Sequence, residues 1–116
     1  MDLIALAHSH EIGDNTAKEF VLTQFTPAIE IFVACKNGRF YGYLNRCPHT
    51  GVNLNWQPDQ FFDFHNEYVQ CCIHGALFRV DNGYCVRGPC AGLSLKAVNI
   101  VIQSGVLYYK GNPNET

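Results

Sequence analysis

The sequence has 116 residues, 47% of them hydrophobic, which is the size of one globular domain with a single core. Eight basic against ten acidic residues give a formal charge of -2, without the basic surface that nucleic acid or an anionic membrane requires. The apolar run at residues 3–7 follows Asp2 and is too short for a signal peptide, and no run approaches the ~20 apolar residues of a membrane span. We therefore expect a cytoplasmic protein that binds neither nucleic acid nor membrane.

Apolar residues recur at every second position, and glycine or asparagine interrupts each run, as is typical of short β-strands joined by turns. In chain order, this pattern predicts strands at 3–7, 18–25, 28–36, 39–45, 68–71, 77–80, 84–86, 95–102 and 106–109, with one turn of helix at 8–12. Turn sequences at 37–38, 81–83 and 104–105 predict three β-hairpins. The fold class is therefore expected to be all-β.

Two segments of this pattern carry further expectations. In the strand at 28–36, Ile31, Val33 and Cys35 fall on one face and Glu30 on the other, which predicts a half-buried strand. The segment 56–68 alternates less clearly and is expected to be a structured loop with one short strand. Trp56 and the phenylalanines within 61–64 are expected to cap the hydrophobic base of the two cysteine-histidine loops at 47–49 and 71–74.

Two short clusters combine a cysteine with a histidine: Cys47-Pro48-His49 and Cys71-Cys72-Ile73-His74. A glycine follows each cluster closely, and glycine lets a tight loop turn its backbone amides towards a bound group. The chain has six cysteines, a high number for a reducing compartment, where thiols are more often metal ligands than disulfides. The two clusters are therefore the candidate metal site.

The order Cys-x-His, then Cys-x-x-His-Gly some twenty residues later, resembles the Rieske iron-sulfur motif, in which two thiolates hold one iron and two imidazoles the other. Gly88-Pro89 also falls where Rieske domains carry a proline loop over the cluster. The resemblance covers residues 18–109. It implies the Rieske iron-sulfur fold, with three antiparallel sheets and the cluster between two hairpin loops, in a single domain over 1–116 whose cluster-binding part is about 45–92.

The resemblance implies that one 2Fe-2S cluster is bound, with Cys47 and Cys71 on the inner iron and His49 and His74 on the outer iron. It also implies a function: a Rieske ferredoxin that passes single electrons from a flavoprotein reductase to a terminal oxygenase or another acceptor. A chain of this length leaves no room for the mononuclear iron domain of a Rieske oxygenase, so we expect an electron-transfer protein without a catalytic site of its own.

Two alternatives stay open at this point. A Cys2His2 set also suits structural zinc, although zinc sites usually pair cysteine with cysteine and histidine with histidine. The other alternative is a non-catalytic Rieske-like subunit of a larger oxidoreductase, such as the small subunit of nitrite reductase, which often lacks the cluster. A red-brown colour separates an iron-sulfur protein from both.

The remaining cysteines and histidines have simpler interpretations. Cys35 is expected to be a small core residue, and the histidines at positions 8, 10 and 65 to be surface residues. Cys72 is excluded as a ligand because the Cys-x-x-His spacing selects Cys71. Cys85 and Cys90 could approach each other across a hairpin, and we expect them to stay reduced in the cytosol.

Three positions depart from the Rieske proteins of quinol-oxidising complexes. Val52 stands where those proteins have a disulfide-forming cysteine, and Ala76 and Phe78 stand where they place a serine and a tyrosine hydroxyl near the cluster. Missing hydrogen bonds disfavour the reduced, more negative cluster, so we expect a potential towards the low end of the roughly -150 to +300 mV range of Rieske centres. Acidic residues at 59–67 are expected to steer a basic partner.

Overall fold

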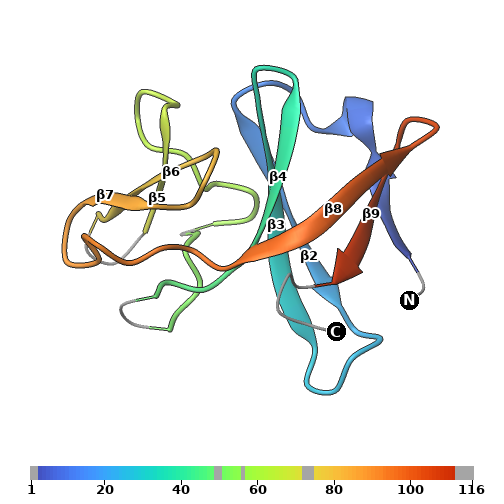
Figure 1. Ribbon diagram of the computed structural model, residues 1–116, viewed down its shortest axis with the longest axis horizontal. Helices are drawn as coiled ribbons and strands as arrows, with labels where there is room; N and C mark the ends of the chain where they lie inside the picture. The colour runs from blue at the N-terminus through green and yellow to red at the C-terminus, as the bar shows by residue number, and fades with distance from the viewer. Residues whose placement is uncertain (1–2, 49–50, 56, 72–74, 112–116) are drawn as a thin grey trace.

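A computed structural model of the chain describes residues 3–48, 51–55, 57–71 and 75–111. Its strands are β1 (Ile4–His8), β2 (Thr16–Leu22), β3 (Ile29–Lys36), β4 (Arg39–Leu44), β5 (Tyr68–Gln70), β6 (Leu77–Arg79), β7 (Cys85–Arg87), β8 (Ala97–Gln103) and β9 (Val106–Gly111). A single 3-10 turn, η1 (Ser9–Glu11), follows β1. The described residues thus form an all-β fold, as predicted (Figure 1).

The strands pair antiparallel in a six-stranded sheet, ordered β1-β9-β8-β4-β3-β2, and a three-stranded sheet, ordered β5-β6-β7. Three sheets were expected, and the described residues group into two because β4 and β8 pair at Gly42↔Val98 and Tyr43↔Ala97. These two residue pairs join the strands on either side of them into one continuous sheet. Figure 1 shows the small sheet standing at one end of the large one.

The three predicted hairpins are confirmed. Asn37 and Gly38 both have positive φ, at 54° and 76°, and they connect β3 to β4. Ser104 and Gly105 join β8 to β9 in the same way, with φ of 51° and 78°. The turn at 81–83 joins β6 to β7.

Strand β3 is buried on both faces rather than on one. Ile31 and Val33 lie in the core of the large sheet, as the alternation predicts, but Phe32 and Ala34 on the opposite face are fully buried too. The residues of the small sheet and its loops cover that second face. Local alternation could not reveal this, because it depends on a distant part of the chain.

The loop at 57–67 packs only partly as expected. Phe61 is 1% exposed and stacks on Phe32 with ring centroids 4.3 Å apart, whereas Phe64 is 94% exposed at the loop tip. One isolated bridge, Phe62↔Val69, is the short strand-like contact of this segment. Trp56 lies outside the described residues. In the part of the chain that the structure describes, no helix is long and apolar enough to cross a bilayer.

A buried hydrogen bond helps to tie the two sheets together. The hydroxyl of Tyr43, on β4, donates a hydrogen bond of 2.6 Å to the carbonyl of Val80, directly after β6. Tyr43 is 2% exposed, and its burial raises the pKa of the hydroxyl, so the proton that it donates is retained. The end of the small sheet is thereby held against the large sheet.

We predict that Tyr43→Phe lowers the free energy of unfolding by about 1–3 kcal/mol, because the Val80 carbonyl loses a buried donor. Urea unfolding measures this change. Tyr84→Phe, at a side chain that is 44% exposed, is the matched control and should change the stability by less than about 0.5 kcal/mol. Equal stability of the two variants would show that the Tyr43 bond does not hold the sheets together.

Candidate metal centre

Cys47 and Cys71 each begin a loop with the same main-chain hydrogen bonds. The amide of Cys47 donates to the carbonyl of Val52 at 2.8 Å, and the amide of Gly51 donates back to the Cys47 carbonyl at 2.7 Å. In the second loop, the Cys71 amide donates to the Ala76 carbonyl at 2.9 Å, and the Gly75 amide donates to the Cys71 carbonyl at 3.1 Å. Two segments far apart in the sequence thus form equivalent six-residue loops, each closed at both ends.

The glycines occupy equivalent positions in the two loops. Gly51 and Gly75 each lie four residues after the cysteine, and their φ angles are 78° and 68°. Other residues adopt this left-handed conformation only with strain, so glycine allows the loop to close around its cysteine. The sequence signal for the loops was therefore the spacing from cysteine to glycine, which is identical in both, rather than the spacing from histidine to glycine.

Both cysteine side chains are buried in one hydrophobic cluster. Cys47 is 2% exposed and Cys71 is 1% exposed, and the cluster also contains Phe61 and Phe78. A thiolate is stable in a low-dielectric interior only when a cation neutralises its negative charge. A bound iron ion would supply the positive charge. The donor set and its surroundings therefore suit the cysteine end of a 2Fe-2S cluster.

The two predicted histidine ligands, His49 and His74, lie outside the described residues, as does Cys72. Among the described residues, no three side chains of histidine, cysteine, aspartate or glutamate are grouped to hold a metal ion. The structure places Cys47 and Cys71 in the same group of buried apolar residues. The four-residue ligand set stays a prediction.

A third loop, at residues 88–93, packs against the second cysteine loop. Gly88 has a φ of 100°, and a Cβ atom there would lie 2.8 Å from the Cα of Ala76, so only glycine permits this approach. This placement agrees with the proline loop expected at Gly88-Pro89. In the same loop, Cys90 is fully buried, and its Sγ lies 3.6 Å from the Sγ of Cys47.

The sequence did not predict that contact: an approach of Cys90 to Cys85 was considered instead, with both thiols expected to stay reduced. The structure has no disulfide between these two residues, and the Cys85 thiol donates to the carbonyl of Arg87 at 3.2 Å. The available signal was the position of Cys90 directly after Gly88-Pro89, in the loop expected to cover the cluster. Cys35, in contrast, is a buried core residue as predicted, and burial together with the Asp14 carboxylate raises the pKa of its thiol.

Ala76 and Phe78, the two positions expected to lack a hydroxyl near the cluster, are buried in the same core region as the cysteines. They are 1% and 0% exposed and belong to the hydrophobic cluster that contains both cysteines. Neither side chain carries a hydrogen-bond donor. The hydrophobic cluster that contains both cysteines therefore has no hydroxyl at these two positions.

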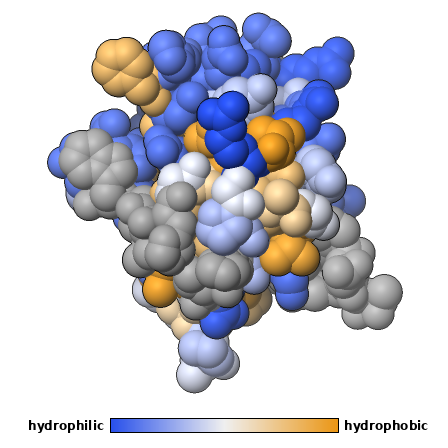
Figure 2. Space-filling model, turned by 90° about the vertical axis from the view of Figure 1, so that its left-hand side faces the viewer, coloured by the Kyte–Doolittle hydropathy of each residue, from blue (hydrophilic) through white to orange (hydrophobic). Residues whose placement is uncertain are grey.

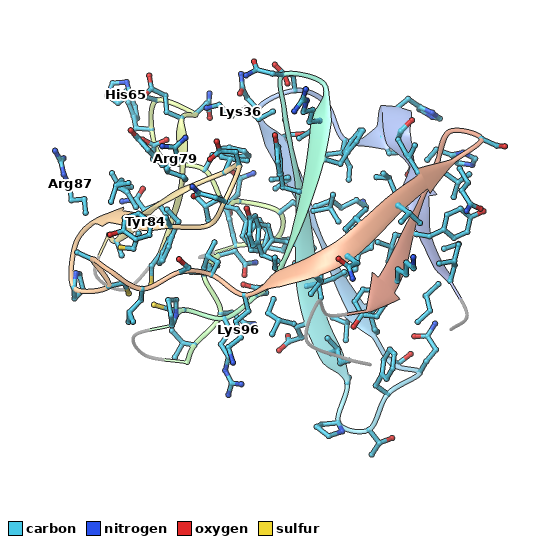
Figure 3. The ribbon with its side chains drawn as sticks, in the orientation of Figure 1. Lys36, His65, Arg79, Tyr84, Arg87 and Lys96 are labelled. Carbon is cyan, nitrogen blue, oxygen red and sulfur yellow. The ribbon has the colours of Figure 1, made fainter. Side chains whose placement is uncertain are left out.

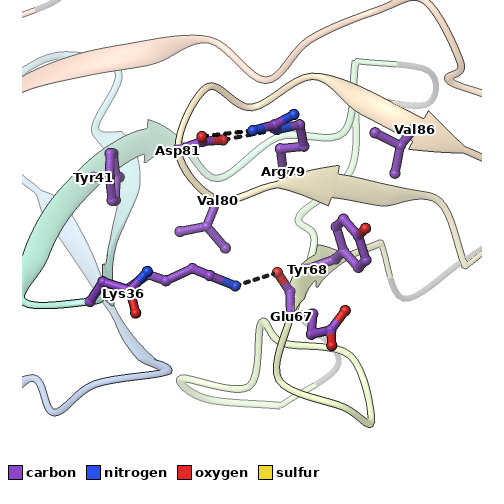
Figure 4. Close-up of a pocket in the computed structure, with 9 residues that line it drawn as sticks. Lys36, Tyr41, Glu67, Tyr68, Arg79, Val80, Asp81 and Val86 are labelled. Atoms are coloured by element: carbon purple, nitrogen blue, oxygen red, sulfur yellow. Dashed lines mark hydrogen bonds and ion pairs between the residues drawn. The ribbon is translucent and has the colours of Figure 1, made fainter.

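A separate pocket of about 420 Å³ lies between the β3–β4 hairpin and the small sheet (Figure 4). Its polar side chains are largely engaged: Arg79 makes a two-fold hydrogen bond to Asp81 at 3.0 and 2.9 Å, and Lys36 donates to the Glu67 carbonyl at 3.1 Å. The Arg79 bond lowers the pKa of Asp81 and raises that of Arg79. No cysteine or histidine is among its described lining residues, so the pocket is distinct from the metal site.

We predict that Cys71→Ala abolishes the binding of iron, because the cluster would lose one of its two thiolate ligands. Iron analysis and the visible absorption spectrum of the purified protein measure this. Cys72→Ala, at the adjacent cysteine, is the matched control and should keep wild-type iron content. Retention of iron in the Cys71 variant, with loss in the Cys72 variant, would reverse the ligand assignment.

The chain was compared with known proteins. A structural match covers 97% of this chain and 100% of the ferredoxin of carbazole 1,9a-dioxygenase from Nocardioides aromaticivorans IC177, with a TM-score of 0.74 and 18% identity. The terminal oxygenase of carbazole 1,9a-dioxygenase from Novosphingobium sp. KA1 gives a TM-score of 0.78 at 20% identity; there the match covers 97% of this chain, which spans 30% of the oxygenase chain.

A further similar structure is the complex of reduced oxygenase and oxidized ferredoxin in carbazole 1,9a-dioxygenase, with a TM-score of 0.76, 18% identity, and 98% of this chain and 97% of that chain covered. At these identities the similarity establishes the fold alone. No curated protein matches the sequence. The family model described as "Rieske [2Fe-2S] domain" matches residues 2–100. The predicted family, fold and 2Fe-2S cofactor are thereby confirmed, and the chain belongs to the Rieske [2Fe-2S] domain family.

Proposed function

We propose that this chain is a Rieske ferredoxin, which takes single electrons from a flavoprotein reductase and passes them to a terminal oxygenase or another acceptor. The observation that supports this most directly is the match over 100% of the ferredoxin of carbazole 1,9a-dioxygenase, because every part of that fold has a counterpart here. The cytoplasm is the proposed location, since the proposed ligands are reduced thiols.

The cluster-binding part is proposed to lie at about 45–92, with Cys47, His49, Cys71 and His74 as ligands. A 2Fe-2S cluster, when bound, accepts and releases one electron. The chain's own residues would hold the cluster between the two closed loops and exclude water from its cysteine end. Electrons would then pass through the histidine end, where the protein cover is proposed to be thinner.

The face around these loops offers a surface on which a partner can dock. We call it the loop end and define it by segments 46–52, 71–76 and 87–93. Exposed apolar side chains lie on or beside it, with Val52 at 39%, Val86 at 44% and Leu93 at 46%. Figure 2 shows apolar residues gathered in the middle of the face at this end of the molecule, below a hydrophilic upper part.

The charge of the loop end is opposite to that of the chain as a whole. Its three segments contain two exposed arginines, Arg46 and Arg87, and neither aspartate nor glutamate, although the chain has a formal charge of -2. Arg87 projects outward from the small sheet (Figure 3). Electrostatic steering depends on the local charge near the docking face, so we propose that this end attracts an acidic partner surface.

The acidic loop that was expected to steer a basic partner is less suited to that role. The Asp63 carboxylate accepts hydrogen bonds from the amides of Glu67 and Tyr68, at 2.8 and 3.0 Å, and the Asp59 carboxylate accepts one from Glu19 at 2.8 Å. These side chains hold the loop in shape. His65, from the same loop, lies at the upper edge of the small sheet in Figure 3, apart from Arg87.

Electron delivery by the reduced protein tests the function together with the charge of the loop end. Mixed with ferricyanide, the reduced protein should donate one electron per chain, at a rate that falls as ionic strength rises, because the acceptor is an anion. Arg87→Glu should slow this step by about tenfold at low salt. Lys110→Glu makes the same charge change on β9, in the distant large sheet, and should leave the rate nearly unchanged.

A protein that takes up no electron, or holds it without release to ferricyanide, would contradict the carrier function. Equal effects of the Arg87 and Lys110 substitutions would contradict the local charge argument and leave the carrier function standing. Tris(phenanthroline)cobalt(III), a cationic acceptor, should show the opposite response to Arg87→Glu.

The apolar surroundings of the cysteines predict how the potential can be changed. Phe78→Tyr should raise the midpoint potential if its hydroxyl reaches a cluster ligand, by roughly 60 mV for a hydrogen bond about 1.4 kcal/mol stronger in the reduced state. Ala76→Ser should act in the same direction. Protein-film voltammetry measures both variants, with Phe62→Tyr as a control that adds a hydroxyl at a partly buried phenylalanine. Unchanged midpoints in both would show that these side chains do not contact the ligands.

A further inference from the structure

The contact between Cys90 and Cys47 joins the proposed ligand to a thiol outside the Rieske motif. The two Sγ atoms are 3.6 Å apart, and the residues are separated by 43 positions in the sequence. Cys90 is 0% exposed and Cys47 2% exposed, so solvent does not compete for the contact. At this distance, either thiol could donate a hydrogen bond to the other.

The loop that carries Cys90 is fixed by its own backbone bonds. The carbonyl of Cys90 accepts from the Leu93 amide at 2.8 Å, and the Gly88 carbonyl accepts from the Ala91 amide at 3.1 Å. Gly88 lies directly against Ala76, which ends the second cysteine loop. Cys90 is therefore held between the two cysteine loops by packing and hydrogen bonds, rather than by chance placement of a mobile side chain.

Binding of iron would determine which of the two thiols donates the hydrogen bond between Cys47 and Cys90. A cysteine that ligates iron is a thiolate and has no proton to donate, so only the Cys90 thiol can act as donor. A hydrogen bond to a charged acceptor is stronger than one between neutral groups, and a dry surrounding strengthens it further. The bond stabilises the reduced state more, since reduction adds negative charge that spreads onto the ligand sulfur.

We propose that Cys90 is a positioning residue that donates an S–H···S hydrogen bond to the Cys47 thiolate and raises the reduction potential of the cluster. The electron enters the cluster without any bond being formed or broken, and the proton stays on Cys90. The bond would partly offset the absence of hydroxyls at Ala76 and Phe78. This inference rests on the proposed assignment of Cys47 as a ligand.

Three variants of the cluster-loaded protein test the proposal. Cys90→Ala should keep wild-type iron content and a Rieske-type EPR spectrum, while its midpoint potential in protein-film voltammetry shifts downward. Cys90→Ser keeps a donor at the same place and should restore the midpoint to the wild-type value or above it. Cys85→Ala is the matched control, because it removes a buried thiol that donates its hydrogen bond to the Arg87 carbonyl, and its midpoint should not change.

An unchanged midpoint in Cys90→Ala would overturn the proposal, and so would equal shifts in the Cys90→Ala and Cys85→Ala variants, which would point to packing alone. Loss of iron from Cys90→Ala would also overturn it, since Cys90 would then be needed to hold the cluster. Cys47→Ala tests the underlying assignment separately: a variant that keeps its cluster would show that Cys47 is no ligand, whatever the Cys90 variants do.

Discussion

The site depends on the closure of two equivalent loops, each by a pair of main-chain hydrogen bonds around a buried cysteine. These bonds are local, so each loop can take its shape from six residues, one of which is a glycine with positive φ. Burial of both cysteines in one apolar cluster then brings the loops together. A thiolate in such a place needs a cation beside it, which links the geometry of the loops directly to the binding of iron.

The large sheet acts as the base on which this arrangement is built. β3 lies between β2 and β4 in this sheet and is covered on both faces, so that Phe32 can stack on Phe61 from the loop region. The Tyr43 hydroxyl fixes the small sheet at Val80, next to the strand that follows the second cysteine loop. The cysteines are thus positioned by a scaffold that apolar packing and buried hydrogen bonds, such as that of Tyr43, hold together.

Much of the fold could be predicted from the sequence, because hairpin turns such as Asn37-Gly38 are set by residues adjacent in the chain. The cysteine-histidine clusters likewise carry their spacing in the sequence. Contacts that depend on the packing of distant segments were not predictable: the second buried face of β3, the exposure of Phe64, and the approach of Cys90 to Cys47. Each of these is decided by which loop covers which face.

The most direct test of the central claim is the EPR spectrum of the dithionite-reduced protein. Ligation of one iron by two cysteines and of the other by two histidines predicts a Rieske-type spectrum in the wild-type protein. Replacement of both His49 and His74 by alanine should abolish that spectrum, while His65→Ala should leave it intact. A purified wild-type protein without iron, or an unchanged spectrum after both ligand histidines are replaced, would contradict the account.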